Sequence, residues 1–200
     1  MVFGDHEGVL ALLTPDDHGW SQSVRRDFWS PVYGSEQRAS VVSFGTTAEL
    51  PAEFVTMLVA DENGQADLGR LVRLKSSATR TPCAYTYNVS RREHSFFFAT
   101  QQGPWSDGFW TSDADFLYWS WDRDAHCYML VLCNGSYADA GGNRVLNCSR
   151  RISYAEVVAS AAKVEMFASE PEQVELQRPL DRVLSEGLPV PDDEPKRMGV

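Results

Sequence analysis

Short runs of apolar and aromatic residues, separated by turn residues, are the feature that most restricts the fold of this chain. In run 83–89, cysteine, tyrosine, tyrosine and valine occupy alternate positions, and a period of two is typical of a β-strand. Further strands are expected at 8–14, 39–45, 52–60, 68–74, 94–100, 114–121, 126–133, 143–149, 163–166 and 173–177. Turns that need positive φ are expected at Asn63-Gly64, Asp107-Gly108, Asn134-Gly135 and Gly141-Gly142. The sequence therefore predicts an all-β fold, an antiparallel β-sandwich of about ten or more strands.

Three segments refine this prediction. Residues 126–133 are apolar at both sets of alternate positions, so we expect a central strand there. Residues 155–162 are rich in alanine and follow a capping-box pattern, which leaves a short helix and a strand as alternatives. Residues 179–186 begin with a proline and are followed by a glycine, which indicates a short helix, and a frayed, charged tail comes after it. We thus expect a β-sandwich domain over 1–178 and a short helix with a flexible tail over 179–200.

The charge balance and the cysteines argue against several functional classes. Eighteen Lys and Arg against 28 Asp and Glu give a net charge of −10, which repels nucleic acid. The longest apolar run, 128–133, is far shorter than the ~20 residues of a membrane helix. The cysteines lack metal-ligand spacing and are interpreted as buried thiols, with a cross-strand disulfide as the lesser alternative. We expect no nucleic-acid or membrane partner, no metal and no cofactor.

Aromatic and basic residues supply the candidate contacts to a carbohydrate. Trp105 and Trp110 lie among glycine and polar residues, so their indoles are either exposed faces for stacking on sugar rings or an aromatic plug in the core. Arg92 and Arg151 each belong to an arginine pair; they either bind a carboxylate or sulfate in bidentate fashion or are solvated strand ends. Tyr33 is a further candidate contact.

Four blocks of sequence carry a resemblance to a known family. The first two are Trp29-Ser30-Pro31-Val32-Tyr33-Gly34 and the stretch from Glu49-Leu50-Pro51 to Leu58. The third runs from Trp105 to Trp119 and contains Ser112-Asp113-Ala114-Asp115-Phe116, and the fourth is Leu132-Cys133-Asn134-Gly135-Ser136-Tyr137 with Gly142 and Val145. In this order, over roughly residues 9–150, they resemble the C-terminal β-rich region of heparinase II/III-like proteins. Members of that family are polysaccharide lyases that cleave uronic-acid-containing glycans by β-elimination.

The resemblance implies a role and partners for the chain. In the family a helical toroid comes first and a β-sandwich region follows, and the acid/base residues and zinc ligands lie upstream of the part resembled here. We therefore expect the C-terminal 200 residues of a lyase, themselves non-catalytic, that pack against the toroid beside an acidic polysaccharide. Such proteins are often periplasmic or secreted; this chain shows no signal-peptide pattern. An apolar face left without its partner would favour self-association.

Two other functions remain open. A stand-alone carbohydrate-binding module would use Trp105 and Trp110 as its stacking platform. An autonomous lyase would need a base such as Tyr33, His18 or His94, and an arginine to neutralise the uronate carboxylate. Nothing in the spacing of these residues assembles such a set, so no catalytic residue is assigned.

Overall fold

The computed structural model describes residues 2–4, 9–15, 19–47, 49, 53–61, 68–75, 80–122, 124–160 and 162–177. Among these residues all the regular structure is β-strand apart from one 3-10 turn, η2 (Pro171–Gln173). The predicted all-β, antiparallel fold is confirmed. No helix in the described ranges has the length and hydrophobicity that a membrane crossing requires. The helix and tail expected over 179–200 lie outside the described residues.

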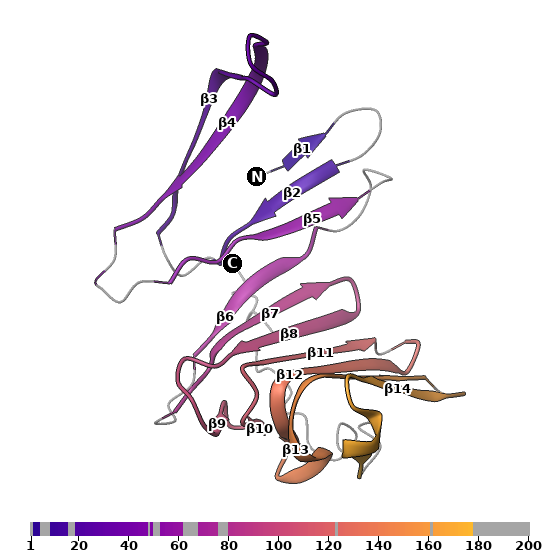
Figure 1. Ribbon diagram of the computed structural model, residues 1–200. Coiled ribbons are helices and arrows are strands. Elements are labelled where there is room, and N and C mark those ends of the chain that lie inside the picture. Colours follow the sequence, from indigo (N-terminus) through magenta and orange to yellow (C-terminus); the bar gives the residue numbers. More distant parts are fainter. Residues whose placement is uncertain are drawn as a thin grey trace, which may run out of the picture. The chain divides into compact units, whose positions relative to one another are not determined.

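The chain divides into two compact units, Met1–Arg73 and Leu74–Val200. The first holds a three-stranded antiparallel sheet in which β2 (Val9–Leu13) lies between β1 (Val2–Gly4) and β5 (Met57–Asp61). It also holds a separate hairpin of β3 (Ser21–Trp29) and β4 (Gln37–Gly45), paired from Ser21↔Gly45 to Trp29↔Gln37 (Figure 1). Strand β6 (Arg70–Leu74) crosses the boundary between the units. That residues 1–178 form one domain stays a prediction.

The second unit is built on one large antiparallel sheet (Figure 1). Its main path runs in the order β7-β8-β11-β12-β13-β14. These strands are β7 (Cys83–Val89), β8 (Arg92–Phe98), β11 (Phe116–Asp122), β12 (Cys127–Ala140), β13 (Asn143–Ala159) and β14 (Val164–Ala168). Off this path, β10 (Trp110–Ser112) pairs with β9 (Trp105–Ser106) and with β12, and β15 (Val174–Leu176) pairs with β13. β12 has a neighbour on each side, as its two apolar faces predict.

The sheet is curled because β12 and β13 are long and bent. The first half of β12 pairs with β11, whereas Ala138–Ala140 pair with β10. Between these halves the register with β13 shifts near Gly135, Asn134 has φ +49°, and such bulges bend a strand and increase its twist. The sequence predicted a turn between strands at Asn134-Gly135, and this is wrong: the strand continues through it. The result is one curled sheet where two stacked sheets were expected.

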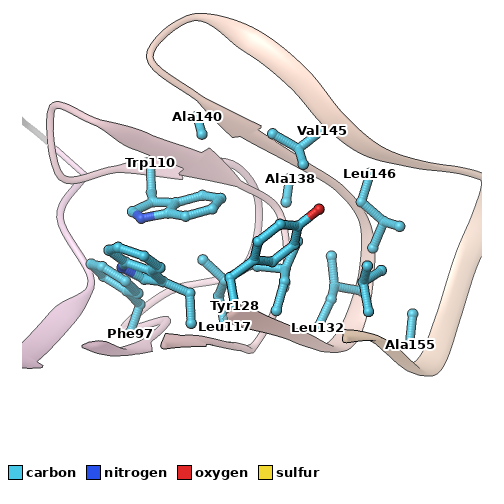
Figure 2. Close-up of a cluster of buried hydrophobic side chains, with 14 of the residues drawn as sticks. Phe97, Trp110, Leu117, Tyr128, Leu132, Ala138, Ala140, Val145, Leu146 and Ala155 are labelled. Carbon is cyan, nitrogen blue, oxygen red and sulfur yellow. The ribbon is translucent and has the colours of Figure 1, made fainter. Parts of the chain in front are cut away.

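The curl encloses the core of the second unit. Figure 2 shows Trp110 and Tyr128 between Ala138 and Val145 on one side and Leu117 on the other. Fully burying one leucine side chain is worth about 1.5–3 kcal/mol, so the inner face of the curl holds this unit together. The alanine-rich segment predicted as either helix or strand is a strand as far as Ala159, and its inward-facing members close the core.

Candidate functional site

The structure buries both tryptophans of the predicted stacking platform. Trp105 is 4% exposed and Trp110 is 1% exposed. The Trp105 Nε1–H donates a hydrogen bond to the carbonyl oxygen of Ala114 at 2.7 Å, and its ring stacks on Phe97. Trp110 packs against Trp119 with ring centroids 6.0 Å apart. Of the two alternatives that the sequence leaves open for these indoles, exposed stacking faces or a core plug, the structure shows the core plug.

The segment Ser112–Asp115 meets the bulge of β12 in a hydrogen-bonded corner, which we call the Asp113 corner. The Ser112 hydroxyl donates to the carbonyl oxygen of Tyr137 at 2.6 Å and accepts from the Ala114 N–H at 3.0 Å. The Asp113 carboxylate accepts from the Ser136 N–H and hydroxyl, both at 2.7 Å, and from the Tyr137 N–H at 3.3 Å. Two blocks that carry the family resemblance are thus hydrogen-bonded to each other.

The two candidate arginines form ion pairs at the protein surface. Arg151 donates to the Asp113 carbonyl oxygen at 2.9 Å and pairs with the Asp115 carboxylate, so it belongs to the Asp113 corner. Arg92 pairs with Asp122 at 2.8 Å. The pKa of Asp122 is lowered by the hydrogen bond from the Ala125 N–H and then by Arg92. Because each guanidinium already faces a carboxylate, these sites offer an acidic polysaccharide little uncompensated positive charge.

Tyr33 lies at the end of the β3–β4 hairpin, in the first unit. Residues 30–36 connect the two strands, and Gly34 among them adopts φ +79°, the left-handed conformation that favours glycine. Tyr33 is fully exposed, and Phe28, Trp29 and Val32 are 62%, 59% and 64% exposed. The resemblance block Trp29–Gly34 and the preceding Phe28 therefore expose large apolar side chains to solvent, and we call Phe28, Trp29, Val32 and Tyr33 the hairpin tip.

A histidine and a tyrosine also come together, on the face of the sheet that points away from the core. His94 Nδ1 lies 2.8 Å from the hydroxyl oxygen of Tyr118, and the His94 ring packs beside Tyr87 at 5.6 Å. Burial lowers the pKa of His94, and the charge of Arg92 lowers it further. The spacing of residues in the sequence did not indicate this pair, because Tyr118 is 24 residues away and only strand pairing makes them neighbours.

The His94 pair does not form an enclosed elimination site. His94 lines an open groove of about 620 Å³, together with Arg91, Arg92 and their acidic partners. Arg92 is held by Asp122, whereas β-elimination needs a cation directed at the uronate carboxylate.

Metal-binding and thiol chemistry are equally limited in the part of the chain that is described. Within it, no group of three or more His, Cys, Asp or Glu side chains is arranged to hold a metal ion. All four cysteines are free thiols; Cys148 is buried, and burial raises its pKa and that of Cys133. Searches for related proteins add no further assignment: no family model matches this sequence, and no curated protein matches it.

Proposed function

We propose that this chain is the C-terminal β-rich part of a heparinase II/III-like polysaccharide lyase that cleaves uronic-acid-containing glycans by β-elimination. Within that enzyme it serves as a non-catalytic accessory region that packs against the helical toroid. The observation that carries this proposal is the hairpin tip, where the large apolar side chains of Trp29, Val32 and Tyr33 in a resemblance block, and of Phe28 just before it, are exposed to solvent.

The β3–β4 hairpin has the properties of a docking element. Its strands are nine residues each, and β3 exposes nearly every side chain. A two-stranded hairpin is marginally stable in water on its own, so contact with a partner would stabilise it. Tryptophan, tyrosine and arginine are the residues most enriched in interface hot spots, and Trp29, Tyr33 and Arg25 all lie on this element. An apolar patch on a helical partner is a suitable counterpart.

The second unit also supports an accessory role, because its polar resemblance residues serve the fold. Its resemblance blocks meet in the Asp113 corner, where carboxylate, hydroxyl and guanidinium groups bind one another. The sandwich architecture belongs to this proposal too. On the outer face of the curled sheet, Phe96, Tyr118 and Val131 lie in register across three strands and are half-buried. An opposing layer from the rest of the enzyme would cover them and complete a sandwich.

The test begins with the gene. We expect the nucleotide sequence upstream of Met1 to continue in frame and to encode a helical toroid. The toroid and this chain, produced separately, should form a complex in isothermal titration calorimetry. The triple variant Phe28→Ser, Trp29→Ser, Tyr33→Ser should weaken it at least about tenfold. Phe167→Ser is the matched control, because Phe167 is similarly exposed but lies on β14 of the other unit.

The activity assay separates accessory from catalytic roles. With uronate glycans, this chain alone should produce no ultraviolet-absorbing unsaturated uronate, whereas the complex with the toroid should produce it. The proposal is overturned by an upstream sequence that encodes no toroid, by a triple variant that binds as tightly as the control, or by absorbance that rises with the isolated chain.

A further inference from the structure

The inner side of the curled sheet contains a hollow that the core does not fill. It has a volume of about 790 Å³, within the range of ~300–1,000 Å³ typical of small-molecule sites. It lies in the second unit, between the inner face of β7 and β8 and the segment 107–110. Its lining includes Lys75, Thr86, Glu93, Ser95, Asp107 and Phe109, with Trp110 and Trp119.

Small polar side chains create this hollow. Thr86 and Ser95 lie directly opposite each other in the β7–β8 register and are 7% and 2% exposed. Their hydroxyl oxygens are 3.4 Å apart, at the long end of hydrogen-bond distance. Neighbouring inward positions hold large apolar residues such as Phe97 and Trp119. A core would normally have leucine or valine at these two positions. The smaller hydroxyl side chains leave space, and they offer hydrogen-bond donors and acceptors to a ligand.

The opposite wall is a constrained turn. One oxygen of Asp107, Oδ1, accepts from the backbone N–H groups of Phe109 at 3.0 Å and Trp110 at 2.6 Å. The carbonyl oxygen of Phe109 in turn accepts from the Gly141 N–H at 2.9 Å. The Phe109 ring is half-buried and packs edge-to-face on Trp110, with centroids 5.7 Å apart. The hollow is therefore bordered by an aromatic ring whose position is set by hydrogen bonds on both sides.

The charges around the hollow discriminate between classes of ligand. Glu93 and Asp107 carry carboxyl groups and Lys75 carries an ammonium group. The two carboxylates and the net charge of −10 repel an anionic ligand, and the lysine repels an organic cation. A neutral ligand rich in hydroxyl groups suits all three, because each hydroxyl both donates and accepts. An aromatic ring beside such polar groups suits a sugar, whose C–H face packs on the ring.

We propose that this hollow binds a neutral sugar residue, with Phe109 as the stacking ring and Glu93, Asp107 and Lys75 as hydrogen-bond partners. The site differs from a platform made of Trp105 and Trp110, because both of these indoles are buried and the ring proposed to stack on the sugar is that of Phe109. The proposal does not depend on the docking of a toroid, since every residue it uses lies in the second unit.

The test is a titration of the full chain followed by intrinsic fluorescence, because Trp110 and Trp119 both line the hollow. The probes are the methyl glycosides of glucose, galactose and mannose, with glucuronate and glucosamine as charged analogues of glucose. We expect a saturable signal with at least one neutral glycoside and weaker binding of both charged sugars. Phe109→Ala should weaken binding of the neutral glycoside about fivefold or more, whereas Phe167→Ala, on β14, should leave it unchanged.

A second variant covers the case in which Phe109→Ala does not fold. Ser95→Leu fills the hollow with an apolar side chain and should abolish binding while the circular dichroism spectrum stays that of the parent. The proposal is overturned if none of the three neutral glycosides binds. It is also overturned if a charged sugar binds as tightly as the neutral glycoside, or if a folded Phe109→Ala or Ser95→Leu variant binds like the parent.

Discussion

Replacing Asp113 with alanine should destabilise the second unit more than any other single change of a polar side chain at the Asp113 corner. The Asp113 carboxylate accepts three hydrogen bonds, two of them from the backbone N–H groups of Ser136 and Tyr137, where β12 bends. Ser136 has no register partner on β13 at this bulge, so its N–H depends on the carboxylate. Removing the carboxylate takes this partner away in a partly buried place.

The magnitude follows from the number and type of these bonds. A hydrogen bond to a charged group contributes about 1.5–3 kcal/mol, but the three share one carboxylate and water reaches part of the corner. We therefore expect Asp113→Ala to lower the free energy of unfolding by about 3 kcal/mol. Asp113→Asn keeps an oxygen acceptor for the backbone groups and should cost about 1 kcal/mol.

Urea denaturation followed by tryptophan fluorescence measures the effect, because four of the six tryptophans lie between residues 105 and 121. The midpoint should shift with an unchanged slope. Asp124→Ala is the control: it removes the exposed ion pair with Arg91 and should cost less than about 1 kcal/mol. Equal midpoints for Asp113→Ala and Asp124→Ala would refute the argument that the carboxylate holds the bend.

Three further predictions concern the bend and two titrating groups. Gly135→Ala places a Cβ 2.7 Å from the Ala114 Cβ and should cost about 1–3 kcal/mol by overpacking; a thermal midpoint equal to that of the parent would contradict the close approach. The pKa of His94 is lowered in the folded state. The contribution of this histidine to stability is therefore full above about pH 6.5, the pKa of histidine in the unfolded chain, and decreases as the pH falls below that value. Urea midpoints at neutral and mildly acidic pH should show a smaller decrease for His94→Gln than for the parent. The hydrogen bond to Glu156 raises the pKa of Tyr154 to about 12. The stability that this hydrogen bond contributes is therefore present at neutral pH and is lost as the pH rises from about 10 towards that value. An ultraviolet titration of tyrosine ionisation should lose one step near pH 12 in Tyr154→Phe, and an unchanged curve would contradict it.

Alternation predicted strands where apolar and polar residues alternate in the sequence and failed where both faces of the strand are exposed. Run 83–89 was recognised because its alternate positions differ in character, and the structure has a strand there. Strand β3 was missed, because residues 21–29 are exposed on both faces and contact with solvent imposes no alternation. Such a strand is recognised only from its hydrogen-bonded pairing with β4, and this pairing leaves no apolar pattern in the sequence.

The site residues were harder to place because their partners are distant in sequence. Asp113 and Ser136 are 23 residues apart, and only the bend in β12 brings them together. Polar and glycine residues around Trp110 suggested an exposed loop. In the structure Asp107 uses its carboxylate to hold the turn, and the indole points inward. The polar residues near Trp110 therefore serve to bind the backbone of the turn, and they do not indicate that the indole ring is exposed.

The bend in β12 has a consequence for the way the second unit unfolds. β12 and β13 each contribute to both sides of the enclosed core, so neither side can detach while the other keeps its hydrogen bonds. Amide protons of Leu130 and Leu146, one from each side, should therefore exchange with solvent through the same global opening, at matching protection.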